Sequence, residues 1–350
     1  ICISPNSCDS ISWTHTDRHG PQEKHLSVAG TVQNSLLKGD STMAQRAVAK
    51  REKARSERSG MSRALVRRET ISGYCFLLPS LIFFIGFVIA PMILCVVYSM
   101  LDYNLAGVQG FAFLKNYAQL LTDTVFHRGL LNTLLIVVVA VPTVTAFSLW
   151  AGSALYKMKP FGRSFFRCVF YLPVVTGSVA VTVVWKWMLN PYYGLINQVT
   201  NNVGFDWLGN SKTAIWCIIL ILFTTSVGQP IVLYVAALGN VDQSLVEAAE
   251  VDGATKLQTF WRIKWPSIMP TTLYVLVITT INTFQCFSLV QLLTSGGPQH
   301  STDTVMYYLY TNAFSLYKYG YANSMGVVLA IIIAILSAIQ FKVMSKDVEY

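Results

Sequence analysis

Residues 245–270 read LVEAAEVDGATKLQTFWRIKWPSIMP and lie between two very apolar runs. Three acidic and three basic side chains fall inside this stretch, a density of charge that makes it unfit for the hydrocarbon core of a membrane. Apolar or small residues recur in it at helical spacing and predict an apolar stripe down one helical face. They are Val246, Ala249, Gly253, Leu257 and Phe260.

Two residues punctuate this segment. Gly253 costs about 1 kcal/mol relative to Ala inside a helix, so we expect it to mark a bend between two short helices. Pro266 is expected to open the next helix, where its missing N–H does no harm. Small side chains in the first half leave room for another backbone to come close. The segment is therefore predicted to be a polar, hinged helical loop that docks against another surface.

The composition indicates a membrane protein. The 350 residues are 53% hydrophobic and only 12% charged, against roughly 25% charged in soluble globular proteins. The net charge is +9, but the basic residues flank apolar spans and form no separate domain. Nucleic-acid binding, the usual alternative for a basic chain, is therefore not supported.

The seven cysteines form no CxxC motif and no Cys/His cluster, so neither a disulfide framework nor a metal site is predicted. The five that lie within or beside apolar runs are interpreted as small buried apolar residues. They are Cys75, Cys95, Cys168, Cys217 and Cys286. No Ser/His/Asp arrangement is found in the spans, so no catalytic residue is predicted.

Six apolar runs are each long enough for a helix of about 20 residues to cross a bilayer. They cover residues 73–100, 130–156, 164–189, 213–238, 267–293 and 322–344. With the amino terminus inside, the cytoplasmic side carries eighteen Lys and Arg from residue 43 onward, against five on the other side. This asymmetry predicts that both termini, and the 245–270 segment, are cytoplasmic.

The amino-terminal part divides into two stretches. Residues 1–42 are polar and aperiodic and lack the apolar run of a signal peptide. Our hypothesis is that they are upstream sequence read in frame, with Met43 or Met61 as the true start; a disordered extension is the alternative. Residues 43–70 are predicted to be a basic cytoplasmic tail, and residues 71–350 the transmembrane domain.

The 245–270 segment resembles the cytoplasmic "EAA" loop of permeases from binding-protein-dependent ABC importers. The resemblance is carried by Glu247-Ala248-Ala249 and Asp252-Gly253-Ala254, and then by Phe260, Ile263, Pro266 and Pro270. Trp265 departs from the family, which usually has Leu before the proline. In such permeases this loop couples to a separate ATPase. The resemblance therefore implies an ATPase-coupling role for Glu247, Ala248, Ala249, Asp252, Gly253 and Ala254, within a coupling loop of residues 239–266.

From about Gly73 onward the chain is similar to the permeases that take up oligosaccharides and related polyols. Its most telling stretch is LVQLLTSGGPQHSTDT, residues 289–304, and shorter matches include Asn132-Thr133 and Asn116-Tyr117. The resemblance implies an all-α polytopic protein with six transmembrane helices and the MetI-like ABC importer permease fold, in the bacterial plasma membrane.

The resemblance also implies partners. They are a second related permease, two ABC ATPase subunits and an extracytoplasmic solute-binding protein. No GxxxxGK[ST] motif occurs in the chain, so ATP and Mg²⁺ would be bound by the ATPase and no cofactor by this chain. An ion-coupled secondary carrier or a membrane enzyme is the alternative, but no acidic residue lies deep in any predicted span.

A substrate path requires polar groups at membrane depth. Asn282, Gln285 and Ser288 follow each other at i, i+3 and i+6, close to one helical face, with Phe284 and Phe287 beside them. Amides and aromatic rings suit sugar hydroxyls and ring faces. Further candidates in the fourth span are Gln229 and Thr225. The alternative is that these amides only hydrogen-bond neighbouring helices.

Overall fold

The computed structural model describes residues 65–344. The expectations for residues 1–42, and for most of the 43–70 tail, fall outside these residues. The chain divides into two units, residues 1–84 and 85–350. In the first unit, residues 65–84 form a helix whose side chains are all exposed.

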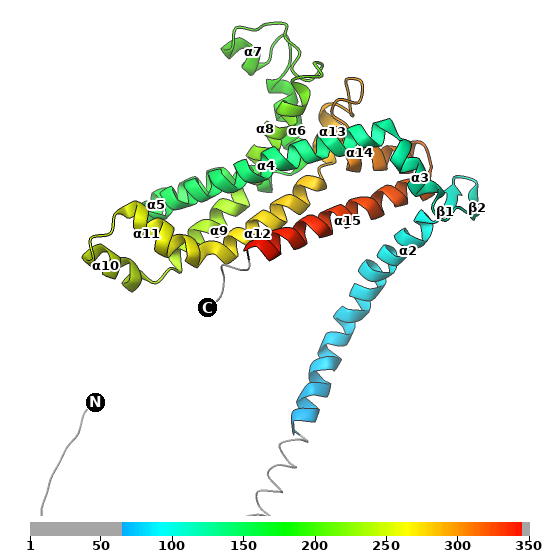
Figure 1. The fold of residues 1–350 in the computed structure, drawn as a ribbon. Helices are drawn as coiled ribbons and strands as arrows, with labels where there is room; N and C mark the ends of the chain where they lie inside the picture. Colours follow the sequence, from blue (N-terminus) through cyan, green and yellow to red (C-terminus); the bar gives the residue numbers. More distant parts are fainter. Residues whose placement is uncertain (1–64, 345–350) are drawn as a thin grey trace, which may run out of the picture. The chain divides into compact units, whose positions relative to one another are not determined.

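The second unit is almost entirely helical (Figure 1). Its only strands among the described residues are β1 (Leu101–Asn104) and β2 (Gly107–Phe111), which pair antiparallel. The first half contains the helices η1 (Ile85–Ile89), α2 (Ala90–Ser99), α3 (Lys115–Thr122), α4 (Thr124–Tyr156), α5 (Pro160–Val175), α6 (Ser178–Met188) and α7 (Leu195–Val199). The second half contains α8 (Ala214–Ser226), α9 (Gly228–Gly239), α10 (Gln243–Val251), α11 (Lys256–Thr259), η2 (Phe260–Lys264), α12 (Trp265–Phe284), α13 (Ser288–Leu293), α14 (Val305–Tyr310), η3 (Thr311–Ser315) and α15 (Tyr319–Met344).

Four helices of the described residues are long and apolar enough to cross a membrane. They are Leu65–Ser99, Thr124–Tyr156, Lys256–Phe284 and Tyr319–Met344. Two bent helix pairs, α5 with α6 and α8 with α9, pass the same test when each pair is taken together. The count rises to six on that reading, and the six segments overlap the six apolar runs of the sequence.

The third apolar run, residues 164–189, is bent by 96° between α5 and α6. Gly177 lies at the bend with φ +74°, in the left-handed region that glycine enters at little cost. Pro173 lies inside α5, where it removes one backbone hydrogen bond. The Thr176 hydroxyl donates to the Leu172 carbonyl at 2.7 Å next to the bend. Hydropathy detects the apolar run, but these residues divide it.

The fifth apolar run, residues 267–293, is also divided. Helix α12 ends at Phe284 and α13 begins at Ser288, so the backbone leaves helical geometry at residues 285–287. The interruption is enclosed by protein, because Phe284 and Cys286 are buried. The Thr304 hydroxyl donates to the Cys286 carbonyl at 3.1 Å. A broken helix at membrane depth requires such partners for its freed backbone groups.

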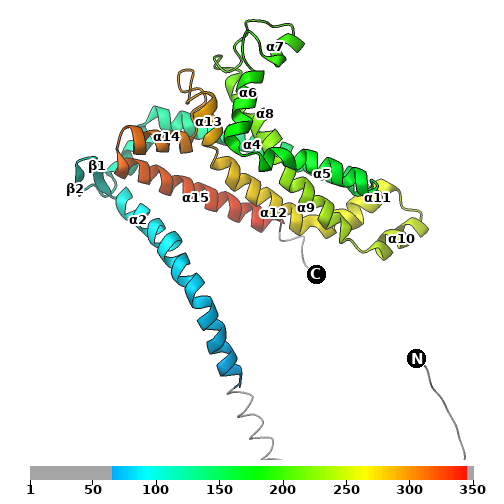
Figure 2. The ribbon, with the colours of Figure 1, turned by 180° about the vertical axis from the view of Figure 1, so that it is seen from behind.

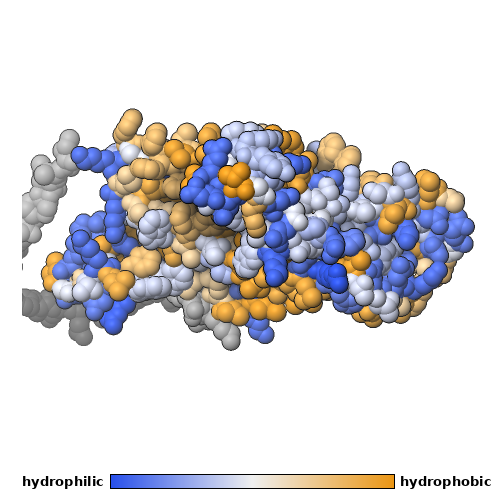
Figure 3. All heavy atoms as spheres, turned by 90° about the horizontal axis from the view of Figure 1, so that it is seen from above, coloured by the Kyte–Doolittle hydropathy of each residue, from blue (hydrophilic) through white to orange (hydrophobic). Residues whose placement is uncertain are grey.

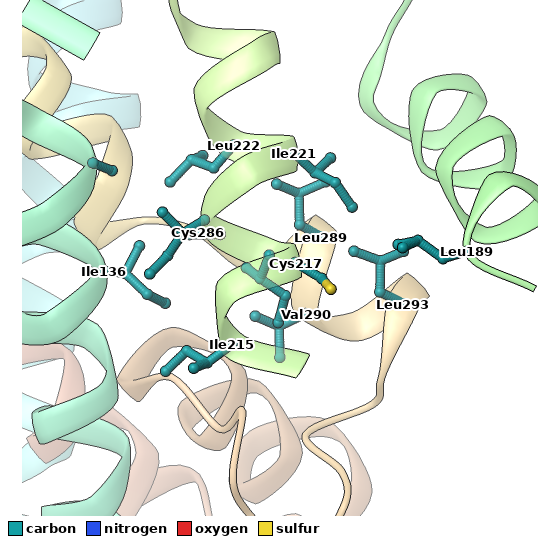
Figure 4. Packing of buried hydrophobic residues seen from close by; sticks show 13 residues of the cluster. Ile136, Leu189, Ile215, Cys217, Ile221, Leu222, Cys286, Leu289, Val290 and Leu293 are labelled. Carbon is teal, nitrogen blue, oxygen red and sulfur yellow. The ribbon is translucent and has the colours of Figure 1, made fainter. Parts of the chain in front are cut away.

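Helix α4 is central to the packing and contacts α8, α9, α12 and α14. Its contact with α9 is close, because a Cβ on Gly152 would lie 2.7 Å from the Cβ of Tyr234. At its other end, Ile136 joins a cluster in which α13 packs against α8 (Figure 4). Val290 and Ile218 are fully buried in that cluster. Apart from the thiols of Cys217 and Cys286, the buried side chains of this cluster are aliphatic and pack closely, as in other protein interiors.

Helices α10 and α11 lie at the same end of this unit as α5, whereas the β-hairpin, α3 and α14 lie at the other end (Figures 1 and 2). Viewed from above, polar residues gather at both ends of the surface and over its middle, and apolar residues line much of its flanks (Figure 3). That distribution suits helices which cross an apolar layer and expose polar loops on both sides.

Candidate functional site

The coupling segment, residues 245–270, folds into the short helix α10, a turn, and the start of the continuous helix Lys256–Phe284, which comprises α11, η2 and α12. Asp242 caps α10 by accepting a hydrogen bond from the Ser244 amide at 2.9 Å. Gly253 follows α10 with φ +77°. The Thr255 and Gln258 side chains then form a capping box that starts α11. The predicted bend at Gly253 is therefore confirmed, as is the position of Pro266 in the first turn of α12.

The predicted apolar stripe of this segment is wrong in part. Val246 is buried and anchors α10, but Leu257 is 68% exposed and Gly253 lies in the turn. A single apolar stripe requires one continuous helix. The bend at Gly253 instead sets the residues before it and after it on two different helix axes.

The side chains predicted to contact an ATPase lie mostly at the surface. Glu247, Ala248, Asp252 and Gly253 are exposed, and Ala249 and Ala254 are half-buried. An open concavity is lined by Ala249, Asp252, Gly253 and Ala254 on one side and by Gln258 and Arg262 on the other. Four of the six candidates thus line one concavity at the turn, and Glu247 and Ala248 are exposed on α10.

A second concavity, of about 180 Å³, brings together three of the five substrate-path candidates. Thr225 and Gln229 reach it from α8 and α9, and Asn282 reaches it from α12. None of the side chains that line it is charged. Asn282 and Gln229 are exposed and form no hydrogen bond with the rest of residues 65–344. Within residues 65–344 these side-chain amides therefore join no neighbouring helix.

Gln285 and Ser288 do not belong to this concavity, and the predicted common face with Asn282 is wrong. Gln285 is the residue that caps the end of α12, and Ser288 is the first residue of α13. A common face at i, i+3 and i+6 requires one uninterrupted helix through residue 293. The chain instead leaves helical geometry at residues 285–287, between α12 and α13.

The structure adds lining residues that the sequence argument missed. Tyr274 and Thr279 line the same concavity as Asn282, and Ser226 lies beside Thr225. The spacing of Tyr274, Ile278 and Asn282, four residues apart along α12, could have revealed this face. Tyr274 is 50% exposed and supplies an aromatic face next to the amides.

On the opposite end from α10, the 289–304 stretch contacts the Asn132-Thr133 match. The Asn132 amide donates to the carbonyls of Ser301 and Asp303 at 3.1 and 3.0 Å. The Thr133 hydroxyl accepts a hydrogen bond from the Val305 amide at 3.1 Å. These contacts hold the loop after α13 against α4, so the motif residues there position a loop.

The same loop contains a buried carboxyl group. Asp303 is 1% exposed, and His300 Nδ1 lies 2.6 Å from Asp303 Oδ2. Burial raises the pKa of the Asp303 carboxyl, although the contact with His300 acts in the opposite direction. Asp303 Oδ1 has no hydrogen-bond partner among the described residues. Its ionised form is therefore disfavoured at this position.

Cysteine burial follows the prediction only in part. Cys217 and Cys286 are buried and Cys95 is half-buried, but Cys75 and Cys168 are exposed in the isolated chain. In residues 65–344 no group of three or more His, Cys, Asp or Glu residues is placed to hold a metal ion.

Comparisons with known proteins agree with this geometry. Residues 126–344 match the family model described as "Binding-protein-dependent transport system inner membrane component". The probable ABC transporter permease protein YurN of Bacillus subtilis is 32% identical over 285 residues, covering 79% of this chain and 97% of that protein. The multiple sugar-binding transport system permease protein MsmF of Streptococcus mutans is 31% identical over 280 residues, covering 78% of this chain and 95% of that protein.

Among solved structures, a chain of a bacterial alginate ABC transporter, in complex with a pentasaccharide-bound periplasmic protein, superimposes with a TM-score of 0.70. The match covers 81% of this chain and 96% of that chain, at 22% sequence identity. It shows that the two chains share a fold.

Proposed function

This chain belongs to the family of binding-protein-dependent transport system inner membrane components, and we propose that it forms half of the sugar path of an ATP-driven importer. It is a non-catalytic, multi-pass permease subunit of the inner, cytoplasmic membrane. The other half of the path is a second, related permease. A separate pair of ABC ATPases binds below, and a solute-binding protein delivers the sugar from outside.

The observation that carries the substrate assignment is the meeting of Thr225, Gln229 and Asn282 around one uncharged concavity. Amide and hydroxyl groups with free hydrogen-bonding capacity suit sugar hydroxyls, and Tyr274 offers a face for a sugar ring. The concavity contains no cation for an acidic group. We therefore assign a neutral oligosaccharide or a related polyol, which fits the multiple-sugar designation of the MsmF relative.

The coupling segment supplies the contact with the ATPase. Its exposed helix α10, the accessible turn at Gly253 and the open concavity around them suit insertion into a groove of another protein. The charge asymmetry of the sequence places this end, and both termini, in the cytoplasm. The 245–270 segment therefore faces the compartment that contains ATP.

Affinity purification of this protein from native membrane tests the subunit assignment. We expect a related permease and an ABC ATPase to co-purify. If the protein purified alone and transported solute into vesicles without ATP, the assignment to an ATP-driven complex would be wrong.

A charge reversal tests the role of the coupling segment. Glu247→Arg should abolish uptake and release the ATPase from the purified complex, while leaving the amount of permease in the membrane unchanged. Glu247 is exposed, so the substitution disturbs no core packing. Uptake at the wild-type rate would contradict the coupling role.

The substrate class is tested in proteoliposomes that contain the purified complex and its binding protein, with ATP supplied to the ATPases. Radiolabelled neutral di- to pentasaccharides are compared with uronic-acid oligosaccharides of the same length. Accumulation of neutral sugars only is expected. Preferential accumulation of the acidic set would overturn the neutral-sugar assignment but leave the importer assignment intact.

A further inference from the structure

A recess of about 280 Å³ lies behind the coupling segment, between that segment and the end of α4. Lys157 follows the last residue of α4, Lys256 is the first residue of α11, and Lys264 is the last residue of η2. All three lysines line the recess. It adjoins the exposed concavity around Gly253, with which it shares Ala254 and Thr259, and is separate from the concavity that contains Asn282.

The positive charge of this recess is not neutralised. Glu250 is the only acidic residue that lines it, so two positive charges are in excess. No carboxylate of residues 65–344 lies within 4.0 Å of the three lysine amines, and these amines form no hydrogen bond in that part of the chain. Lysine side chains that line one recess without a carboxylate partner attract an anion, although Lys264 also lies over the Tyr156 ring.

One further polar group of the recess lacks a partner. Ser153 lines it from α4, and its buried hydroxyl forms no hydrogen bond within residues 65–344. A buried hydroxyl without a partner costs free energy unless a bound molecule satisfies it. Ser153 therefore offers an anion a neutral donor besides the lysine amines.

Apart from Tyr156 and Thr259, the rest of the lining is apolar. Leu238 and Val246 are buried residues of α9 and α10, and Phe260 is half-buried at the start of η2. Outside the lining, the Trp261 ring meets the Phe260 ring edge-on and lies tilted 5.4 Å from the Trp265 ring, and Trp261 is 54% exposed. Tryptophan beside lysine is typical of the level at which a membrane meets water. The ligand that suits the recess thus has an anionic group and an apolar part.

We propose that this recess binds a phosphate group, and that its resident ligand is the headgroup of an anionic glycerophospholipid of the cytoplasmic leaflet. The lipid source rests on the membrane orientation given above for the coupling segment. Clusters of Lys on the cytoplasmic side of membrane helices are suited to anionic lipid headgroups. A free phosphate would satisfy the lysines but leave the apolar wall uncovered.

A bound headgroup would join the α4–α5 turn to the coupling segment. One such link already exists, because Lys264 and Arg163 both lie 5.7 Å from the centre of the Tyr156 ring. Phosphate bridging of Lys157 to Lys264 would add a second link at the same place. The headgroup would therefore restrain the coupling segment relative to α4.

The test measures lipid binding and requires no transport. The full chain, with its co-purified partners, is delipidated in detergent and titrated with phosphatidylglycerol or phosphatidylcholine, and bound lipid is counted by native mass spectrometry. A Lys near an anionic membrane surface contributes about a fivefold factor to the affinity for that surface. Lys157→Gln with Lys264→Gln should therefore weaken phosphatidylglycerol binding about twenty-five-fold and leave phosphatidylcholine binding unchanged.

The control variant loses the same two positive charges at positions outside the recess. Lys212→Gln with Lys318→Gln removes two exposed lysines predicted to lie on the outer side, and should change binding less than twofold. Glu250→Gln removes the only acid of the recess and should strengthen phosphatidylglycerol binding about fivefold, a gain that misfolding cannot produce. Wild-type binding by both the double lysine variant and Glu250→Gln would overturn the proposal.

A parallel titration with inorganic phosphate distinguishes the source of the anion. We expect inorganic phosphate to show no binding that depends on Lys157 and Lys264. If inorganic phosphate at the same concentration bound with the same dependence on these two lysines, the lipid source would be overturned. If lipid binding behaved as expected but no ATPase co-purified, the proposed function would fail while this site would stand.

Discussion

The Tyr321 hydroxyl donates a hydrogen bond of 2.6 Å to Oδ2 of Asp123, which lies 198 residues earlier in the chain. The Tyr308 hydroxyl donates to the same oxygen at 2.8 Å. Oδ1 of Asp123 accepts from the amides of Val125 and Phe126 and thereby caps α4. One carboxylate thus joins the starts of α4 and α15 to α14. Burial and the hydrogen bond to Asp123 raise the pKa of Tyr308 to about 12.

We predict that Asp123→Ala lowers the free energy of unfolding by about 3 kcal/mol, because it removes a helix cap and leaves two tyrosine hydroxyls without their charged acceptor. Asp123→Asn retains the cap and should cost less. The thermal midpoint of the purified full chain measures both. If the two variants lost the same amount of stability, the whole loss would come from the charge and the helix cap would contribute nothing.

The pKa of Asp123 gives this junction a pH dependence. Burial acts to raise the pKa, but the hydrogen bonds from Tyr321, Tyr308 and the two amides lower it below its ordinary value of 3.8. Stability from a depressed carboxyl pKa is present above the unfolded value and is lost as the pH falls through the folded value. We predict that the stability gap between wild type and Asp123→Asn narrows in thermal scans below about pH 4.

The pH dependence of stability that comes from Asp303 should have the opposite sign. Its folded pKa is raised by burial, so the ionised form destabilises the native state, and stability is lost as the pH rises through the folded pKa. Asp303→Asn is expected to raise the thermal midpoint at pH 7 and to have little effect once acid has neutralised the wild-type carboxyl. A variant that is less stable than wild type at every pH would show that the carboxylate is needed for the His300 contact.

Two substitutions at Gly253 should separate backbone conformation from bulk. A Cβ on Gly253 would meet no atom within 4 Å, so Gly253→Ala adds only the strain of φ +77°, about 1 kcal/mol. Gly253→Pro cannot adopt a positive φ and also removes the amide that donates to the Glu250 carbonyl. We predict that Ala retains most of the uptake and that Pro abolishes it, with equal protein in the membrane. Wild-type uptake by Gly253→Pro would remove this turn from the coupling mechanism.

Asn282→Leu should reduce sugar uptake by about tenfold or more, because a hydrogen-bonding group is lost from the proposed path. The thermal midpoint should not change, since the Asn282 amide has no partner in the described part of the chain. Gln340→Leu is the matched control: its amide donates to the Thr280 hydroxyl at 2.8 Å between α15 and α12. That variant should be less stable but should transport normally per assembled complex. Loss of assembly in Asn282→Leu would instead assign Asn282 to helix packing.

The sequence by itself located the apolar segments, the polar coupling segment between two of them and the bend at Gly253. These features depend on a residue and its neighbours within a few turns of helix. Hydropathy adds along a short window, and Gly and Pro act on the local backbone. The same local reasoning failed for Gln285 and Ser288, because it assumed that one apolar run makes one straight helix.

Only the tertiary structure decided where the runs break and which polar groups meet. The end of α12 at Phe284 is accompanied by a hydrogen bond from Thr304 to the Cys286 carbonyl, and no window around residue 285 contains that partner. Thr225, Gln229 and Asn282 line one concavity because α8, α9 and α12 fold together. Asp123 meets Tyr321 for the same reason. Hydrogen bonds act over about 3 Å, so residues separated by tens or hundreds of positions can form them only when the packing of the helices brings them together.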